Sequence, residues 1–284
     1  MKRNFLITGA TGTIAREMIK LMISQGICVR IGVRDVLKAT QLDTAGCPVV
    51  LFDYNKPETF QEAFENINGL FLATPISIPR IDDLLIPALD TAKRMGVDQI
   101  VSLGSIGSEL NHTPLSIAEK CVQSCGIDYT ILRPNILMQN FGNLAGSIIK
   151  SSSLLHLPAN RARVSFVDGR DVAEAAANSL MDSSLRNRIF VLTGKEALDH
   201  YQIAHILSKV SGKTVTYIPV SHNDAKMELL RAGWSEDAAD IMIGLYEIAR
   251  KGWCEEVRPD LAEILKREPR TFEQYAWDYR DLWV

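Results

Sequence analysis

The first fifteen residues constrain the fold most strongly. A short apolar run at 5–7 leads into the glycine-containing stretch TGATGT at 8–13. Apolar residues then recur at helical spacing at Ile14, Met18 and Met22. Glycine lets a backbone approach a pyrophosphate closely, and the N–H groups of a helix start attract an anion. The stretch therefore predicts a dinucleotide-binding turn; the alternative is a plain strand-to-helix connection.

The glycine spacing departs from the usual Gly-x-Gly-x-x-Gly fingerprint. Here it is Gly9-x-x-Gly12-x-x-Ala15, and alanine in the third place still allows close packing of helix on strand. This form resembles the one found in extended and atypical short-chain dehydrogenase/reductases. The cofactor contacts expected from this turn are Gly9, Thr11, Gly12, Thr13 and Ile14.

The end of the second predicted strand, 27–34, indicates which cofactor is preferred. A basic residue there favours the 2′-phosphate of NADP, and an acidic one favours the ribose hydroxyls of NAD. Arg34 ends the strand, Lys38 follows one turn later, and Asp35 stands between them. We expect NADP(H) to be preferred, with NAD(H) possible. The alternative is that both basic side chains are merely solvated.

Further cofactor contacts are expected where later strands end. Asp53 follows the strand 49–52 and is a candidate acceptor for an adenine amino group, or simply a turn residue. Small residues after the strand 69–73 fit close approach to the nicotinamide ribose. The remaining candidates for cofactor contact are Tyr54, Ala73, Thr74, Pro75, Pro134 and Asn135.

Strands alternate with helical stretches along most of the chain, including strands at 99–103 and 129–132. This pattern predicts an α/β fold, a Rossmann-type doubly wound parallel sheet. A smaller, mostly helical C-terminal lobe completes the fold, and we expect the active cleft between the two. The predicted domains are 1–150, with 160–193 returning to it, and 194–284.

Composition excludes several classes of function. The formal net charge is −3, so a nucleic-acid partner is not expected. We expect no signal peptide and no membrane span, and therefore a cytoplasmic protein, as monomer or homodimer. The five cysteines are scattered, and Cys121 and Cys125 have no histidine nearby. Reduced thiols are expected rather than a metal site.

Several motifs together resemble the NmrA-like group of atypical short-chain dehydrogenase/reductases. They are TGATG at 8–12, Glu119 followed by GIDYTILRP at 126–134, VSFVDGRDVA at 164–173, and the segments 203–221 and 270–275. The likeness covers nearly the whole chain. It is greatest to NADPH-dependent quinone and dye reductases of this group, which implies a small-molecule substrate.

One departure from the family pattern concerns catalysis. Redox-active relatives carry Tyr-x-x-x-Lys, in which the tyrosine moves the proton and the lysine lowers its pKa. Aligned on Glu119, this chain has Asn111 and Leu115 at those positions.

Substitutes for the missing pair are few. Lys120, paired with Ser116 four residues earlier, is a weak replacement, and the alternative is a solvated helix face. Redox-active relatives also carry Ser or Thr at the end of the fifth strand. Ser105 stands at that position and can donate to a carbonyl. His112 is a candidate proton donor or a solvated loop residue.

The stretch 135–160 is expected to form a pocket wall, with a loop at 151–156. Met138, Phe141 and Leu155 would line an apolar substrate site, and Gln139 or Asn140 would orient the substrate. His156 completes the candidate substrate contacts. Packing within the C-terminal lobe explains the same residues equally simply.

The leading functional hypothesis is an NADP(H)-dependent oxidoreductase that reduces a quinone, carbonyl or conjugated small molecule. One alternative is a dinucleotide-binding redox sensor that regulates a partner without turnover. Another is a non-redox enzyme, an isomerase or cyclase, on the same fold. The missing Tyr–Lys pair is compatible with all three, because hydride transfer depends above all on positioning.

Overall fold

The structure, a computed structural model, describes residues 3–39, 44–75, 78, 80–109, 113–231 and 233–284. The chain forms two compact units. Unit 1 contains residues 1–134, 169–191 and 263–266, and unit 2 contains 135–168, 192–262 and 267–284. The two units therefore divide the chain at other points than the predicted domains, since residues 135–150 belong to unit 2.

Unit 1 is built on a seven-stranded sheet in the order β3-β2-β1-β4-β5-β6-β8. The strands β1 to β6 pair in parallel, with Ile7 beside Ile31 and Phe71, for example. This order is that of a Rossmann-type doubly wound fold, which confirms the predicted fold class. The strands are β1 (Phe5–Ile7), β2 (Arg30–Val33), β3 (Val49–Leu51), β4 (Gly69–Ala73), β5 (Gln99–Leu103), β6 (Asp128–Pro134) and β8 (Arg188–Leu192).

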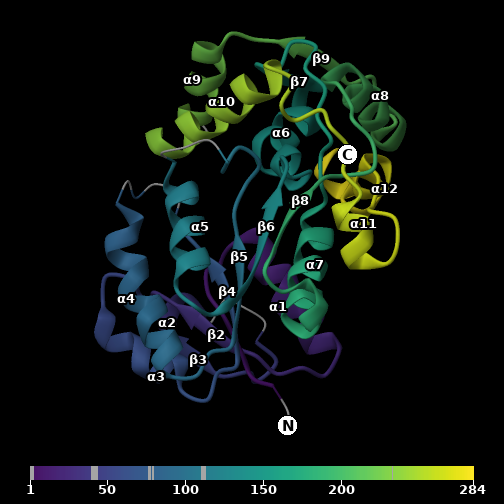
Figure 1. Cartoon of the computed structure of the whole chain (residues 1–284). Helices are drawn as coiled ribbons and strands as arrows, with labels where there is room; N and C mark the ends of the chain where they lie inside the picture. Colours follow the sequence, from purple (N-terminus) through teal and green to yellow (C-terminus); the bar gives the residue numbers. More distant parts are fainter. Residues whose placement is uncertain (1–2, 40–43, 76–77, 79, 110–112, 232) are drawn as a thin grey trace. The chain divides into compact units, whose positions relative to one another are not determined.

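Helices cover both faces of this sheet because its strands are apolar on both sides. Leu6, Leu70 and Ile100 face a core shared with α3, α4 and α5, while α1 and α7 pack together on the other face (Figure 1). The helices of unit 1 are α1 (Thr13–Ser24), α2 (Val36–Ala39), α3 (Phe60–Phe64), α4 (Ile81–Arg94), α5 (Pro114–Ser124) and α7 (Gly169–Met181).

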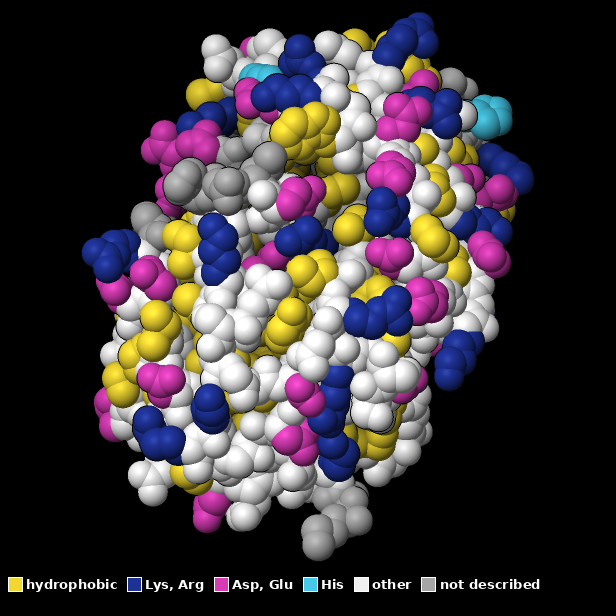
Figure 2. Space-filling view, in the orientation of Figure 1, with side chains coloured by type: hydrophobic (Ala, Val, Ile, Leu, Met, Phe, Trp, Pro, Cys, Tyr) yellow, Lys and Arg dark blue, Asp and Glu magenta, His cyan; other side chains and the backbone are white. Residues whose placement is uncertain are grey.

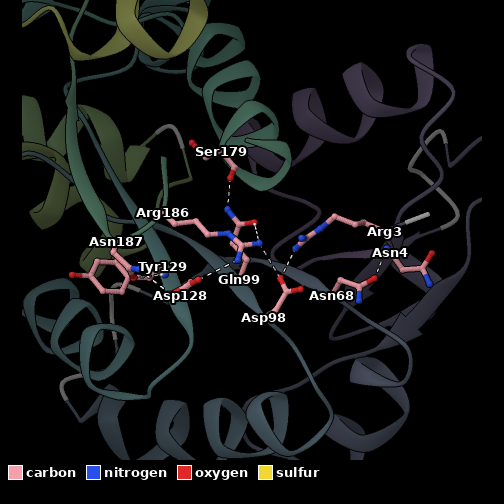
Figure 3. Close-up of polar contacts among 10 residues, drawn as sticks. All are labelled: Arg3, Asn4, Asn68, Asp98, Gln99, Asp128, Tyr129, Ser179, Arg186 and Asn187. Carbon is pink, nitrogen blue, oxygen red and sulfur yellow. Dashed lines mark hydrogen bonds and ion pairs between the residues drawn. The ribbon is translucent and has the colours of Figure 1, made fainter. Parts of the chain in front are cut away.

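Arg186 joins the amino ends of β5 and β6. Its guanidinium bonds Asp128 at 3.1 Å and both Asp98 and Gln99 at 3.2 Å (Figure 3). Asn187 donates to Asp128 at 2.9 Å, and this bond and the ion pair with Arg186 lower the pKa of Asp128. The network fixes the strand starts, so the loops at the opposite, carboxyl ends extend from a rigid base.

Unit 2 is mostly helical, as predicted. Its helices are α6 (Gln139–Ser152), α8 (His200–Ser211), α9 (His222–Arg231), α10 (Glu236–Arg250) and α12 (Phe272–Asp278), and α11 (Asp260–Leu265) ends beyond the unit boundary. The predicted loop at 151–156 is wrong. Its first residues end α6, and Leu154–Leu157 forms β7, which pairs in parallel with β9 (Thr216–Pro219). The run of serines at 151–153 is typical of a loop, and the strand after it forms only because it pairs with β9, about sixty residues further along the chain.

The core of unit 2 is aromatic. Phe141 and Phe272 lie 5.0 Å apart between ring centroids, and Phe141 and Phe166 lie 5.1 Å apart. His200 is fully buried beside these rings and beside Tyr217, at 5.3 Å, with no hydrogen-bond partner for either ring nitrogen among the described residues. Burial lowers the pKa of His200 to about 3. His200 is therefore a neutral core residue.

Two features of the structure concern the partners expected from the sequence: the charges on the surface and the length and apolar character of the helices. On the face drawn in Figure 2, Lys and Arg side chains are interspersed with Asp and Glu. Within the described ranges, no helix combines the length and the apolar character needed to cross a bilayer.

We predict that His200 makes the protein acid-sensitive. The unfolded chain binds a proton at His200 near its ordinary pKa of about 6.5, whereas the folded chain binds it only near pH 3. The free energy of unfolding should fall by about 1.4 kcal/mol per pH unit as the pH drops between these values. His200→Phe should flatten this dependence in urea titrations at several pH values. Replacing the exposed His205 of α8 with Gln should not, and equal slopes in both variants would contradict the assignment.

Candidate functional site

The glycine turn between β1 and α1 has the predicted form. Gly9 adopts a left-handed backbone with φ of 63°, and its carbonyl accepts the N–H of Gly12 at 2.8 Å. A Cβ at Gly9 would lie 2.6 Å from the Cβ of Ala73. Glycine is required here both by the backbone conformation and by the close approach of β4.

A hydroxyl holds this turn against β4. The Thr8 Oγ1 donates to the carbonyl of Phe71 and accepts the N–H of Ala73, both at 3.0 Å. The buried Tyr54 donates its hydroxyl to the Ala73 carbonyl at 3.2 Å, and burial raises the pKa of Tyr54. These bonds fix the ends of β1, β3 and β4 relative to one another. The sequence predicts that Tyr54 contacts the cofactor, but its hydroxyl is directed toward β4 by the bond to Ala73.

The start of α1 is open to an anion. Gly12 is the N-cap and offers no side-chain cap, and the first turn holds no acidic residue. Thr11, Gly12 and Thr13 are exposed, whereas Ile14 is buried beneath them. The first N–H groups of a helix lack intrahelical acceptors and carry the positive end of its dipole. An anion bound here would satisfy them.

The loop after β4 adds an unsatisfied group. Thr74 and Pro75 are half-buried, and the Thr74 Oγ1 is buried without a hydrogen-bond partner in the part of the chain that the structure describes. A buried hydroxyl normally has a partner. Together with the close-packed glycine turn and the uncapped helix start, this orphaned group fits a dinucleotide bound along the carboxyl ends of β1 and β4.

The end of β2 presents Arg34 to solvent, and no partner for its side chain occurs within the described ranges. Asp35 is engaged locally, since its carboxylate accepts the N–H of Leu37 at 3.0 Å at the start of α2. Asp35 therefore supports the helix start, which leaves Arg34 as the charged group available at this strand end. The side chain of Lys38 lies outside the described residues.

Asp53 shapes a turn. Its carboxylate accepts the N–H of Asn55 at 3.0 Å and the side-chain amide of Asn55 at 3.3 Å. The carboxylate remains half-buried, so contact with an adenine stays a prediction beside this observed role.

Ser105 lies just after β5 and is half-buried. Its backbone is fixed by Ser108, whose hydroxyl accepts the Ser105 N–H at 3.0 Å and donates to the Ser105 carbonyl at 2.7 Å. The Ser105 hydroxyl itself has no partner among the described residues. It is therefore held by a rigid turn and available as a donor.

An ion pair between the half-buried Arg133 and the buried Glu119 supports this strand end. Arg133 at the end of β6 bonds both carboxylate oxygens of Glu119 on α5, with a shortest distance of 2.6 Å. The hydrogen bonds to Glu119 raise the pKa of Arg133. A Cβ at Gly104 would lie 2.5 Å from the same carboxylate. Glu119 and Arg133, which both belong to the motifs that resemble the NmrA-like group, are therefore ion-pair partners.

The structure describes some of the candidate substitutes for the missing Tyr–Lys pair. Asn111 and His112 lie outside the described residues, and Leu115 is half-buried. Ser116 donates its hydroxyl to the Thr113 carbonyl at 2.9 Å and is buried, whereas Lys120 is exposed. The catalytic role of Ser116 with Lys120 stays a prediction.

The remaining candidates for cofactor contact, Pro134 and Asn135, make hydrogen bonds within their own units. Pro134 ends β6 with its carbonyl accepting the N–H of Ile106 at 2.9 Å. The Asn135 amide donates to Ser165 at 2.8 Å and to the Cys254 carbonyl at 2.9 Å. Its contact with a cofactor stays a prediction, with no support from its side chain.

The candidate substrate contacts lie in unit 2. Met138, Phe141 and Leu155 are buried in its core, which favours the alternative of lobe packing. Gln139 donates to the buried Asp168 at 2.9 Å, and His156 lies 3.2 Å from Glu228. Asn140 is half-buried. Their role toward a substrate stays a prediction.

Sequence reasoning missed the part played by Thr8. The signal was present, because a threonine at the end of an apolar strand can bond the neighbouring strand through its hydroxyl.

Across the described residues, no group of three or more His, Cys, Asp or Glu side chains is arranged to hold a metal ion.

We predict that Gly9→Ala raises the dissociation constant for NADP at least about tenfold, because its methyl group would overlap Ala73. Gly26→Ala is the matched control. Gly26 has φ of 73°, yet no described atom lies within 4 Å of the position of its Cβ. Fluorescence titration should separate the variants, with melting curves to verify folding. Equal affinity in both would contradict the role of the turn.

Comparison with known proteins agrees with this geometry. An NAD(P)H azoreductase of Xenophilus azovorans is 28% identical over 95% of this chain and 96% of its own length. The triphenylmethane reductase of Citrobacter sp. superposes with a TM-score of 0.85 and 27% identity, over 96% of this chain and 98% of that one. Its complex with NADP(H) gives a TM-score of 0.83 and 26% identity, over 95% and 98%. The NmrA-like family model matches residues 1–276, and the chain belongs to this family.

Proposed function

We propose that the chain is an NADP(H)-dependent oxidoreductase that reduces a quinone, a carbonyl or a conjugated molecule such as a dye. The relatives support an NAD(P)H-dependent oxidoreductase of the NmrA-like type, since they are an NAD(P)H azoreductase and a triphenylmethane reductase. The observation that carries the proposal is the uncapped start of α1 behind the tightly packed Gly9.

The residues of unit 1 would hold the cofactor in a defined direction. The N–H groups at the start of α1 would bind the pyrophosphate, and Arg34 would bind the 2′-phosphate through its fork of donors. Thr74 would regain a partner for its buried hydroxyl. When bound, NADPH supplies the hydride.

The chain's own residues would act on the acceptor mainly by orientation. Ser105 would donate a hydrogen bond to an acceptor oxygen, because its hydroxyl has no partner among the described residues and its backbone is held by Ser108. Leu115 cannot lower the pKa of a neighbouring donor, since it carries no charge. This favours quinones and conjugated dyes, which accept a hydride readily and can take their proton from solvent.

The proposal is tested by measuring NADPH consumption against quinones, azo dyes, triphenylmethane dyes and enones, with NADH in parallel. We expect turnover with at least one conjugated acceptor and a higher kcat/KM with NADPH. Cofactor binding without consumption on any acceptor would contradict the reductase. It would favour a redox sensor or a non-redox enzyme instead.

We predict that Arg34→Ala lowers the NADPH-to-NADH ratio of kcat/KM at least about tenfold, by lowering kcat/KM with NADPH alone. The loss of a charge-assisted bond to the 2′-phosphate is worth about 1.5–3 kcal/mol. Arg94→Ala is the control, because Arg94 is also exposed but lies in the last turn of α4. A parallel loss with NADH would contradict a role in cofactor choice.

A further inference from the structure

Two cysteines meet at the amino ends of β2 and β3, which the proposed function does not use. The Sγ atoms of Cys28 and Cys47 lie 2.8 Å apart, and neither cysteine is in a disulfide. Cys28 is exposed, whereas Cys47 is buried at 7% exposure. One sulfur is therefore open to reagents, and the other lies directly behind it.

The backbone brings these two sulfurs together. Ile31 pairs with Val49 and donates its N–H to the Pro48 carbonyl at 2.8 Å. Continued two residues back, this register places Cys47 opposite Val29, next to Cys28. Cys47 is fixed in turn by its N–H bond to the Thr44 carbonyl at 2.8 Å. Neighbouring parallel strands are close enough for a disulfide.

The other three cysteines differ in their surroundings. Burial raises the pKa of Cys121 and Cys125, and raises that of Cys254 to about 11. A higher pKa leaves less of the reactive thiolate. Cys28 differs from these three cysteines because it is exposed and has a second sulfur 2.8 Å away.

We propose that Cys28 and Cys47 form a reversible thiol–disulfide site that reacts with low-molecular-weight disulfides. The Cys28 sulfur attacks the external disulfide, whose S–S bond breaks, and one thiol leaves with the Cys28 proton. The Cys47 sulfur then attacks Cys28 and releases the second thiol with its own proton. Two protein thiols are oxidised to one disulfide while one external disulfide is reduced to two thiols.

The bond would close the segment 28–47, which carries Arg34. Such a closed loop restricts the unfolded chain and so favours the folded state. We expect the melting temperature of the oxidised protein to exceed that of the reduced protein by about 5 °C.

The test treats the full-length protein with oxidised glutathione and follows its intact mass and peptide map. The wild type should lose the mass of two hydrogens, with the bond mapping to Cys28 and Cys47, and dithiothreitol should reverse the change. Cys47→Ser should instead keep one glutathionyl group on Cys28, because the second sulfur is missing. Cys28→Ser should show neither product nor the rise in melting temperature.

Cys121→Ser is the matched control and should behave like the wild type. A wild type that accumulates the glutathionyl adduct as Cys47→Ser does would overturn the proposal, as would a disulfide that maps to other cysteines. A wild type whose thiols all stay reduced, under conditions that glutathionylate Cys47→Ser, would overturn the proposal too. None of these readouts depends on cofactor binding or reductase activity.

Discussion

The contact between Gly9 and β4 is the constraint on which the rest of the site depends. Gly9 can approach Ala73 only because it lacks a side chain, and Thr8 secures the approach with two hydrogen bonds. Tyr54 adds a third bond from the end of β3. This arrangement directs the turn toward the uncapped start of α1, so an anion-binding position follows from packing between strand ends.

The two ends of the sheet in unit 1 serve different purposes. At the amino ends of β5 and β6, Arg186 satisfies three neighbours at once and holds the strands in place. At the carboxyl ends, Arg34 and the Ser105 hydroxyl lack partners among the described residues, and Thr74 has an unsatisfied hydroxyl. Polar groups without partners thus gather where a ligand of a doubly wound sheet binds.

Much of unit 1 could be predicted from the sequence, because its strands are short apolar runs that end at glycine or polar residues. The strands 69–73 and 99–103 match β4 and β5 residue for residue. The glycine turn was equally readable, since its conformation is local. The structural roles of Tyr54 and Asn135 were not, because each side chain bonds a backbone group far away in sequence.

Unit 2 was harder to predict for the same reason. Leu154–Leu157 becomes a strand only through its pairing with Thr216–Pro219, and Phe141 is buried by rings from three distant segments. The burial of His200 likewise depends on rings from distant parts of the chain, such as Phe141 and Tyr217. Periodicity within a short window cannot report these contacts.

The most direct test of the central claim is a crystal structure of the protein with NADP⁺. The account predicts the pyrophosphate at the start of α1 between Gly9 and Gly12, with the 2′-phosphate within hydrogen-bond distance of Arg34. A nucleotide bound elsewhere, or one whose 2′-phosphate points away from Arg34, would contradict it.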